Sequence, residues 1–363
     1  MAKGQRASKA RWLGRGLFLA ASFGVASAAY AASGADCDRA CLQGMMTTYM
    51  SALAAHDPSR LPVASTVRYT ENGSELKLGG EGLWATFNKA EPYRHDVVDP
   101  ETGGIASYFT IVENKLLPFH DLLAVRLKVR NRRITEIETV VNRHARAAGN
   151  MLTLKPSWME EMERIEAPAT RLTREQLIEA TIGYMRAIAF HDGKAAPFAK
   201  SCIRLENGNI TAIGKDDVSP VPIGSGPPVS TDTIPGLPPQ APPPKLMGLG
   251  CDEQLDYMAY SFITGFRDAH FPVIDVERQK VYAVFDFMRR GNVEAWTWNG
   301  NTYPMPEAMR YPNEILNTEI FKFSGGKLTR VEAVFTGPQA YKRGTGWPGG
   351  GKEESLPYKA SQP

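Results

Sequence analysis

The sequence lacks the short motifs that point to common chemistry on nucleotides, esters or metal ions. It has no G-x-S-x-G hydrolase elbow, no phosphate-binding P-loop and no H-E-x-x-H zinc-protease pattern. Cysteine is scarce too, because the 4 residues form no C-x-x-C pair and have no histidine beside them. We therefore expect neither a metal site nor a cofactor.

Long apolar runs are missing after residue 31, so we expect no membrane span in the remaining chain. Residues 1–31 begin with five basic side chains, continue with an apolar stretch and end in Ala-Tyr-Ala, which is typical of a signal peptide. Removing these five charges changes the formal net charge from +3 to −2 and leaves no basic patch for nucleic acid. The sequence thus predicts a periplasmic or secreted protein that binds no nucleic acid, with an uncleaved anchor as the alternative.

Export would allow the cysteines to form disulfides. Cys37 and Cys41 are four residues apart, so they would share one face of a helix and could pair. Cys202 and Cys251 bracket a proline-rich stretch, and a bond between them would close a loop of about 50 residues. The rival pairings would cross between the two halves of the chain, and we disfavour them.

The chain contains an internal repeat. Residues 49–57 (YMSALAAHD) and 184–192 (YMRAIAFHD) agree at six of nine positions, 135 residues apart. The triplet Glu-Asn-Gly follows at the same spacing, at 71–73 and 206–208. Further matches follow in order at spacings of 176 and 194 residues, and a tandem duplication explains them. The last pairs of matching segments are 98–101 with 274–277 and 134–138 with 328–332.

The growing spacing places 41 and then 18 extra residues in the second copy. The first excess holds ten prolines, so we expect an extended surface loop over 216–248. The second, near 290–315, is predicted to be a hairpin extension, a lid or a contact with the other copy. The predicted parts are a first domain 36–148, a linker 149–171, a second domain 172–342 and a flexible tail 343–363.

Each copy is predicted to begin with a helix and to continue mainly as strands. In the first copy, apolar periodicity indicates a helix from about Cys37 to Ala55, which His56-Asp57-Pro58 ends. A strand over 67–71, a short helix over 79–89 and an antiparallel meander follow. This order is typical of an α+β fold.

These residues resemble the nuclear transport factor 2-like superfamily, also called the SnoaL-like or cone-shaped α+β barrel group. The opening helix, the A-x-H-D break, the strand ending in Glu-Asn-Gly and the final Ile-Thr-Glu-Ile-Glu strand carry the resemblance, over 36–145 and again over 172–340. It implies two cone-shaped, curved antiparallel sheets, each wrapped by helices around a pocket. The second copy also resembles a branch without assigned function from bacteria and fungi, in which arginine usually stands where His270 lies.

Members of this superfamily include a ketosteroid isomerase, scytalone dehydratase, limonene epoxide hydrolase, polyketide cyclases and lyases of lignin-derived aromatics, whereas others only bind or dimerise. The fold alone does not choose among them. The resemblance implies a cofactor-free acid-base lyase, isomerase or hydrolase acting on a small apolar or aromatic molecule. The alternative is a non-catalytic ligand-binding or protein-interaction module, and in either case we expect the two copies to pack on each other.

Carboxylates and histidines near strand ends are the candidates for proton transfer. Glu71 and Glu206 end equivalent strands, and burial in a pocket would raise the pKa of either side chain. His95 precedes a strand in the first copy, while Asp268 and His270 are two residues apart in the second and would share a strand face. Solvated turn or hairpin residues are the alternative in each case.

Ligand-binding candidates are Arg267, which could hold an anionic group, and Tyr69, Tyr108 and Tyr282, which could line a pocket or belong to the core. The repeated His-Asp pairs are interpreted as helix ends with a capping aspartate, and the repeated D-x-E segments as turns. Because the insertions, two cysteines and His270 all distinguish the second copy, we expect the working site there.

Overall fold

The computed structural model describes residues 36–114, 119–143, 145–214, 216–221, 236–238, 248–256, 260–347 and 353–355. The predicted signal peptide, most of the proline-rich segment and much of the predicted tail lie outside these residues. Among the helices of the described ranges, none is long and apolar enough to cross a membrane.

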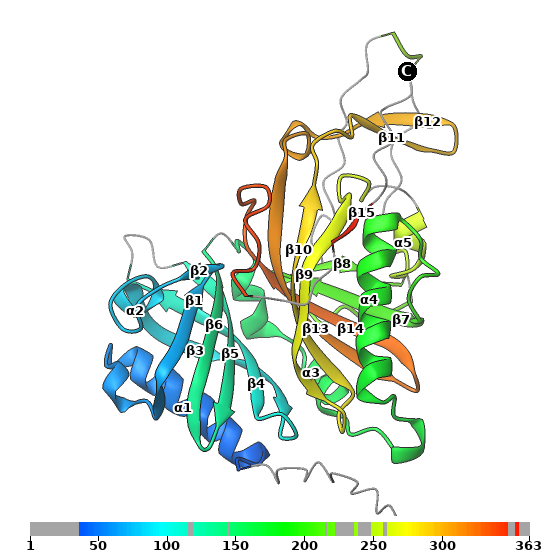
Figure 1. Ribbon diagram of the computed structural model, residues 1–363. Coiled ribbons are helices and arrows are strands. Elements are labelled where there is room, and N and C mark those ends of the chain that lie inside the picture. Colours follow the sequence, from blue (N-terminus) through cyan, green and yellow to red (C-terminus); the bar gives the residue numbers. More distant parts are fainter. Residues whose placement is uncertain are drawn as a thin grey trace, which may run out of the picture. The chain divides into compact units, whose positions relative to one another are not determined.

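The first copy forms a six-stranded sheet with the strand order β2-β1-β6-β5-β4-β3. Neighbouring strands are antiparallel except for β1 and β6, which run parallel. Helix α1 packs against this sheet, and its apolar face joins the core of the first copy (Figure 1). The elements are α1 (Arg39–Ala54), β1 (Val63–Glu71), β2 (Ser74–Glu75), α2 (Leu83–Thr86), β3 (Phe87–Asp99), β4 (Gly104–Glu113), β5 (His120–Arg130) and β6 (Arg133–Asn142).

The second copy repeats this order in a seven-stranded sheet, β15-β9-β10-β13-β14-β7-β8, with one added edge strand. Helix α4 packs on it as α1 does on the first sheet. The short helix α3 (Pro156–Glu163) lies in the connection between the copies. The elements are α4 (Arg174–Phe190), β7 (Phe198–Glu206), β8 (Asn209–Ala212), α5 (Glu253–Asp256), β9 (Gly265–Asp275), β10 (Lys280–Arg289), β11 (Ala295–Trp298), β12 (Asn301–Pro304), β13 (Asn313–Ser324), β14 (Lys327–Phe335) and β15 (Glu354–Ser355).

The two sheets correspond strand by strand at the spacings found in the sequence. Strands β1 and β7 are offset by 135 residues, β4 and β10 by 176, and β6 and β14 by 194. The expected tandem α+β fold is therefore present. Each sheet is mixed rather than purely antiparallel, because β7 and β14, like β1 and β6, are joined through a long connection instead of a hairpin and run parallel.

The repeated His-Asp pair ends the first helix of each copy. His56 and His191 adopt left-handed backbone conformations, with φ of 51° and 57°. Asp57 then accepts a hydrogen bond from the amide of Ser59 at 3.0 Å, and Asp192 accepts one from Lys194 at 2.9 Å. The pair thus terminates a helix and caps the following turn, which agrees with its interpretation from the sequence.

The second insertion and the end of the chain are both built into the fold. The 18 extra residues contain the hairpin β11–β12, whose Trp296 and Tyr303 rings stack 4.6 Å apart against the second core. Of the expected flexible tail, residues 343–347 are anchored instead. Trp347 donates to the Thr70 hydroxyl at 2.9 Å, and the guanidinium of Arg68 lies 4.1 Å from its ring. Cation–π contact of this kind holds the segment in place.

Both expected disulfides are present, Cys37–Cys41 and Cys202–Cys251, with sequence separations of 4 and 49 residues. Disulfides are typical of proteins that reside in an oxidising environment. The longer bond joins β7 to the segment before α5, and both of its cysteines are fully buried.

The two disulfides should differ in their contribution to stability. Loop closure predicts a loss of about 4 kcal/mol in the free energy of unfolding for a C202S/C251S variant and about 2 kcal/mol for C37S/C41S. Chemical denaturation of both double variants beside the unchanged protein measures this. Equal losses would contradict the assignment of the longer bond as the main covalent restraint.

Candidate functional site

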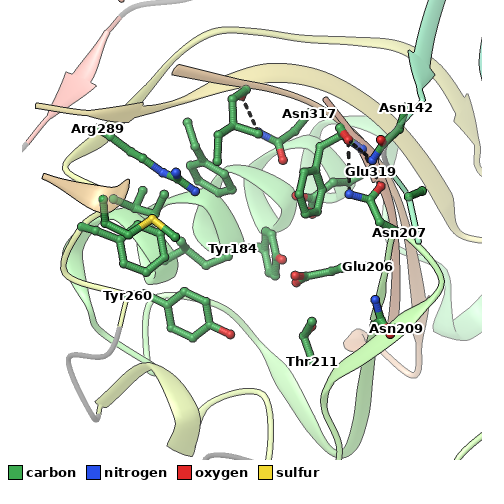
Figure 2. Close-up of a pocket in the computed structure, with 18 of the residues that line it drawn as sticks. Asn142, Tyr184, Glu206, Asn207, Asn209, Thr211, Tyr260, Arg289, Asn317 and Glu319 are labelled. Atoms are coloured by element: carbon green, nitrogen blue, oxygen red, sulfur yellow. Dashed lines mark hydrogen bonds between the residues drawn. The ribbon is translucent and has the colours of Figure 1, made fainter. Parts of the chain in front are cut away.

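The second copy encloses a cavity of about 450 Å³ on the α4 side of its sheet. This volume lies within the range of small-molecule binding sites. Strands β7, β10 and β13 contribute one wall, and α4 and the segment after α5 contribute another (Figure 2). Most of the lining is apolar: Ile188, Phe262, Ile263, Phe287, Met309, Ile315 and Phe335.

Two carboxylates face this cavity. Glu206 ends β7, and Glu319 lies in the middle of β13, opposite Ala333 of β14. Glu319 is only 3% exposed, and its Oε2 atom has no hydrogen-bond partner among the described residues. The Oε1 atom of Glu206 lies 3.4 Å from Nε of Arg204, so one carboxylate has a cationic neighbour within ion-pair distance and the other has none.

The two carboxylates are therefore unequal. Burial raises the pKa of Glu319 to about 8, and the charge of Glu206 raises it further, against the opposing influence of Arg204 and the Tyr184 hydroxyl. Near pH 7 Glu319 holds its proton, while Arg204 supports the negative charge of Glu206. One acid and one base thus share a cavity, an arrangement suited to proton transfer.

Two tyrosines supply neutral hydrogen-bond donors. The fully buried Arg204 donates from Nη2 to the Tyr260 hydroxyl at 2.5 Å and to Gln254 at 2.7 Å, which fixes Tyr260 at the cavity wall. Burial raises the pKa of Tyr260 to about 12, so its hydroxyl keeps its proton. The Tyr184 hydroxyl, by contrast, is buried and forms no hydrogen bond of ordinary length within the described part of the chain. Figure 2 shows Tyr184 and Glu206 pointing into the same space.

An uncompensated cation lies at another part of the cavity. Arg289, at the end of β10, is 7% exposed and forms no ion pair with any described residue. Its Cζ atom lies 4.9 Å from the centroid of the Phe262 ring. Burial lowers the pKa of Arg289 to about 10, which still leaves the guanidinium charged at neutral pH.

The corresponding part of the first copy is filled. Strand register places Leu123 and Val125 where the second copy has Asn317 and Glu319, and both are fully buried apolar residues. The Trp84 ring packs edge-on against Tyr49 in the same core. These side chains occupy the volume that the second copy leaves open.

Glu71, the counterpart of Glu206, is fully engaged. Its Oε2 accepts hydrogen bonds from the amide of Leu83 at 2.6 Å and from the Tyr69 hydroxyl at 3.1 Å. Its Oε1 accepts one from Arg143 at 2.8 Å. Glu71 and Tyr69 therefore anchor α2 to the end of β1 in this structure and face no cavity.

The predicted histidines lie between the two sheets. His95 is fully buried, with Nδ1 2.9 Å from Glu332 and Nε2 3.3 Å from Nζ of Lys280. His270 lies 3.3 Å from Glu138. In both cases a histidine of one copy pairs with a glutamate of the other, and the two glutamates occupy equivalent positions of β6 and β14.

The remaining predicted residues also lie away from the cavity. Arg267 forms two hydrogen bonds of 2.7 Å with Glu314, and Asp268 lies beside it with a left-handed φ of 52°. The rings of Tyr108 and Tyr282 meet edge to face, 6.1 Å apart, in the buried cluster shared by the two copies. Of the nine predicted catalytic and ligand-binding residues, only Glu206 lines the cavity.

The D-x-E segments form reciprocal contacts between the copies. Arg39 of α1 binds Asp275 at 2.7 Å, and Arg174 at the equivalent position of α4 binds Asp99 at 2.8 Å. Sequence spacing relates the two arginines and the two aspartates in the same way as the strands. Within the described ranges no group of three or more histidine, cysteine, aspartate or glutamate side chains could hold a metal ion.

The raised pKa of Glu319 has a consequence for stability. The folded carboxyl keeps its proton to about pH 8, whereas the unfolded one loses it near its ordinary value of 4.5. Because the folded state binds more protons in this interval, the free energy of unfolding falls as the pH rises from 4.5 to 8. Glu319→Gln removes this loss, so we expect the variant to gain about 3 kcal/mol on the unchanged protein at pH 8 and little at pH 4.5. Urea denaturation at both pH values measures the difference, and a gain independent of pH would refute it.

Comparison with known proteins identifies a family. A family model described as "Domain of unknown function (DUF8021)" matches residues 35–141 and 170–335. No curated protein matches the chain. Two solved structures are similar over a part of it, with TM-scores too low to support any argument. A proposed polyketide cyclase from Silicibacter sp. tm1040 has 14% identity and a TM-score of 0.24, covering 28% of this chain and 89% of that one. A proposed isomerase from Bacillus subtilis has 11% identity and a TM-score of 0.24, covering 44% of this chain and 86% of that one. Since the family model spans well over half of the sequence, the chain belongs to the family described as a domain of unknown function, DUF8021.

Proposed function

We propose that the cavity of the second copy is the active site of a cofactor-independent enzyme that moves a proton on a small, largely apolar molecule. One observation carries the proposal: Glu206 and Glu319 face the same apolar cavity, and only Glu206 has a neighbouring cation. Structural ion pairs satisfy both partners, as they do around Glu71, whereas an unpartnered buried carboxyl is costly and calls for a use.

The roles follow from the protonation states. Glu206, supported by Arg204, accepts a proton from a carbon beside a carbonyl group, and returning that proton to a second carbon completes an isomerisation. Protonated Glu319 and the Tyr184 hydroxyl donate hydrogen bonds to the carbonyl oxygen as negative charge develops on it. A lyase or hydrolase reaction would use the same acid and base on a different leaving group.

The first copy, in this proposal, is a structural partner. The equal strand orders and constant spacings support an origin by tandem duplication, after which the second copy kept an open cavity and the first filled it. The two disulfides and the basic-apolar N-terminal sequence support export to the periplasm or the medium.

Deuterium exchange tests this function even while the product of the reaction is unidentified. The purified protein is incubated in D₂O with steroid ketones, terpenoids and lignin-type aromatic ketones, and mass spectrometry follows both mass gain and conversion. Protein-dependent deuteration that Glu206→Gln abolishes and Glu71→Gln preserves is the expected result. Compounds that bind the cavity but never exchange or react would instead establish the alternative, a non-catalytic ligand-binding module.

A further inference from the structure

We propose that the ligand of this cavity is an elongated apolar or aromatic molecule with one carboxylate, and that Arg289 binds this carboxylate at the end remote from Glu206 and Glu319. The inference rests on the proposed function only for the chemistry at the end that holds the two glutamates. The binding claim itself rests on the position, burial and missing partner of Arg289.

The two ends are set by strand register. Arg289 lies opposite Asn313 at the start of β13, and Glu319 lies six residues further along the same strand. At about 3.3 Å per residue this separates their backbones by roughly 20 Å. Alternate residues of β10 and β13 face the cavity, so both side chains point into it. Figure 2 shows Arg289 across the cavity from Glu206, with Asn317 between Arg289 and Glu319.

The charges of the cavity do not balance without an anion. Arg204 and Glu206 neutralise each other, and Glu319 is protonated near neutral pH because burial raises its pKa. Arg289 remains as a buried positive charge with no acidic neighbour in the described part of the chain, and the exposed Arg146 adds a second cation at the lining. A buried charge is expensive unless it is paired, so the site is completed by an anionic group of the ligand.

The chemistry of Arg289 selects the kind of anion, and its surroundings select the rest of the molecule. A guanidinium offers two parallel N–H donors that match a planar carboxylate. The Phe262 ring packs against this guanidinium, and Phe287, Met309 and Ile315 line the same cavity, so the part of the ligand between its two ends is apolar. A small neutral molecule would leave Arg289 unpaired.

Paired acids and amides test the inference by calorimetric titration of the full chain. The probes are 4-phenylbutanoate, 6-phenylhexanoate and 8-phenyloctanoate, each beside its primary amide, which keeps the shape and removes the charge. We expect at least one acid to bind tenfold or more tightly than its amide. Arg289→Met should abolish this preference, and Arg289→Lys should retain part of it.

A matched control and a second readout separate the outcomes. Arg290→Gln alters the neighbouring arginine, which binds Ser355 outside the cavity, and should leave the preference unchanged. Thermal unfolding of each variant verifies its fold. Equal affinities for acids and amides, binding of no probe, or an unchanged preference in Arg289→Met would overturn the inference.

Failure of this inference differs from failure of the proposed function. If Glu206→Gln and Glu319→Gln keep the acid preference but no compound exchanges deuterium, the carboxylate site stands and the catalytic proposal falls. If neutral ketones exchange as fast in Arg289→Met as in the unchanged protein, catalysis stands and the carboxylate site falls.

Discussion

Replacing Glu319 by glutamine should lower the rate of proton transfer in the cavity by about 10²–10⁴-fold, which is the usual contribution of a positioned acid or base. The amide keeps the size of the side chain and can still donate a hydrogen bond, but it cannot release a proton. The substitution also removes a carboxyl whose burial raises its pKa to about 8, so the fold should tolerate it.

Three comparisons make this result specific. Glu206→Gln removes the other half of the pair and should cause a loss of similar size, whereas Glu71→Gln, at the equivalent position of the filled first copy, should leave the rate unchanged. The rate of the unchanged protein should fall as the pH rises through about 8, because Glu319 then loses its proton. A Glu319→Gln variant with full activity would remove Glu319 from the mechanism.

Removing the Glu332 carboxylate should destabilise the protein by about 3–5 kcal/mol, the usual cost of breaking a buried charged pair. Glu332 is 2% exposed and accepts hydrogen bonds from His95 at 2.9 Å, from Trp158 at 3.2 Å and from the Tyr93 hydroxyl. Burial alone would raise the pKa of Glu332, but these three partners hold it below its ordinary value. Glu332→Ala leaves three buried polar groups without their acceptor.

The control for this variant is an exposed acidic residue. The Glu101 side chain is 73% exposed and pairs with Arg174 at the surface, so Glu101→Ala should cost less than about 1 kcal/mol. Chemical denaturation monitored by tryptophan fluorescence measures both variants. A loss below about 1 kcal/mol for Glu332→Ala would contradict the view that His95 and Glu332 join the two copies rather than serve chemistry.

The fold was largely predictable because its signals are local. The repeated helix, the His-Asp helix end, the Glu-Asn-Gly turn and the final strand occur in both copies, and the structure keeps their spacings of 135, 176 and 194 residues. Pairing of the cysteines followed from their separation. The parallel contacts of β1 and β7 were missed because they depend on how distant segments meet, which alternation within one strand does not reveal.

The site was harder to predict for physical reasons. Strand β9 shifts its register against β10 twice around Asp268 and His270, and a one-residue shift moves a side chain to the other face of a sheet. Those residues consequently face away from the cavity. Glu319 was overlooked because a single charge in an apolar strand is usually solvated; aligning it with Val125, at the 194-residue spacing, was the available signal. Arg289 aligns with Glu113 at the 176-residue spacing, another change of charge between copies.

The most direct test of the central claim is the carboxyl pKa of Glu319, measured by ¹³C NMR titration of glutamate-labelled protein with Glu319→Gln to assign the signal. A cavity that holds one shared proton requires a pKa of about 8 for this carboxyl. A value near the ordinary 4.5 would mean that both glutamates are ionised at neutral pH, and the proposed acid of the site would not exist.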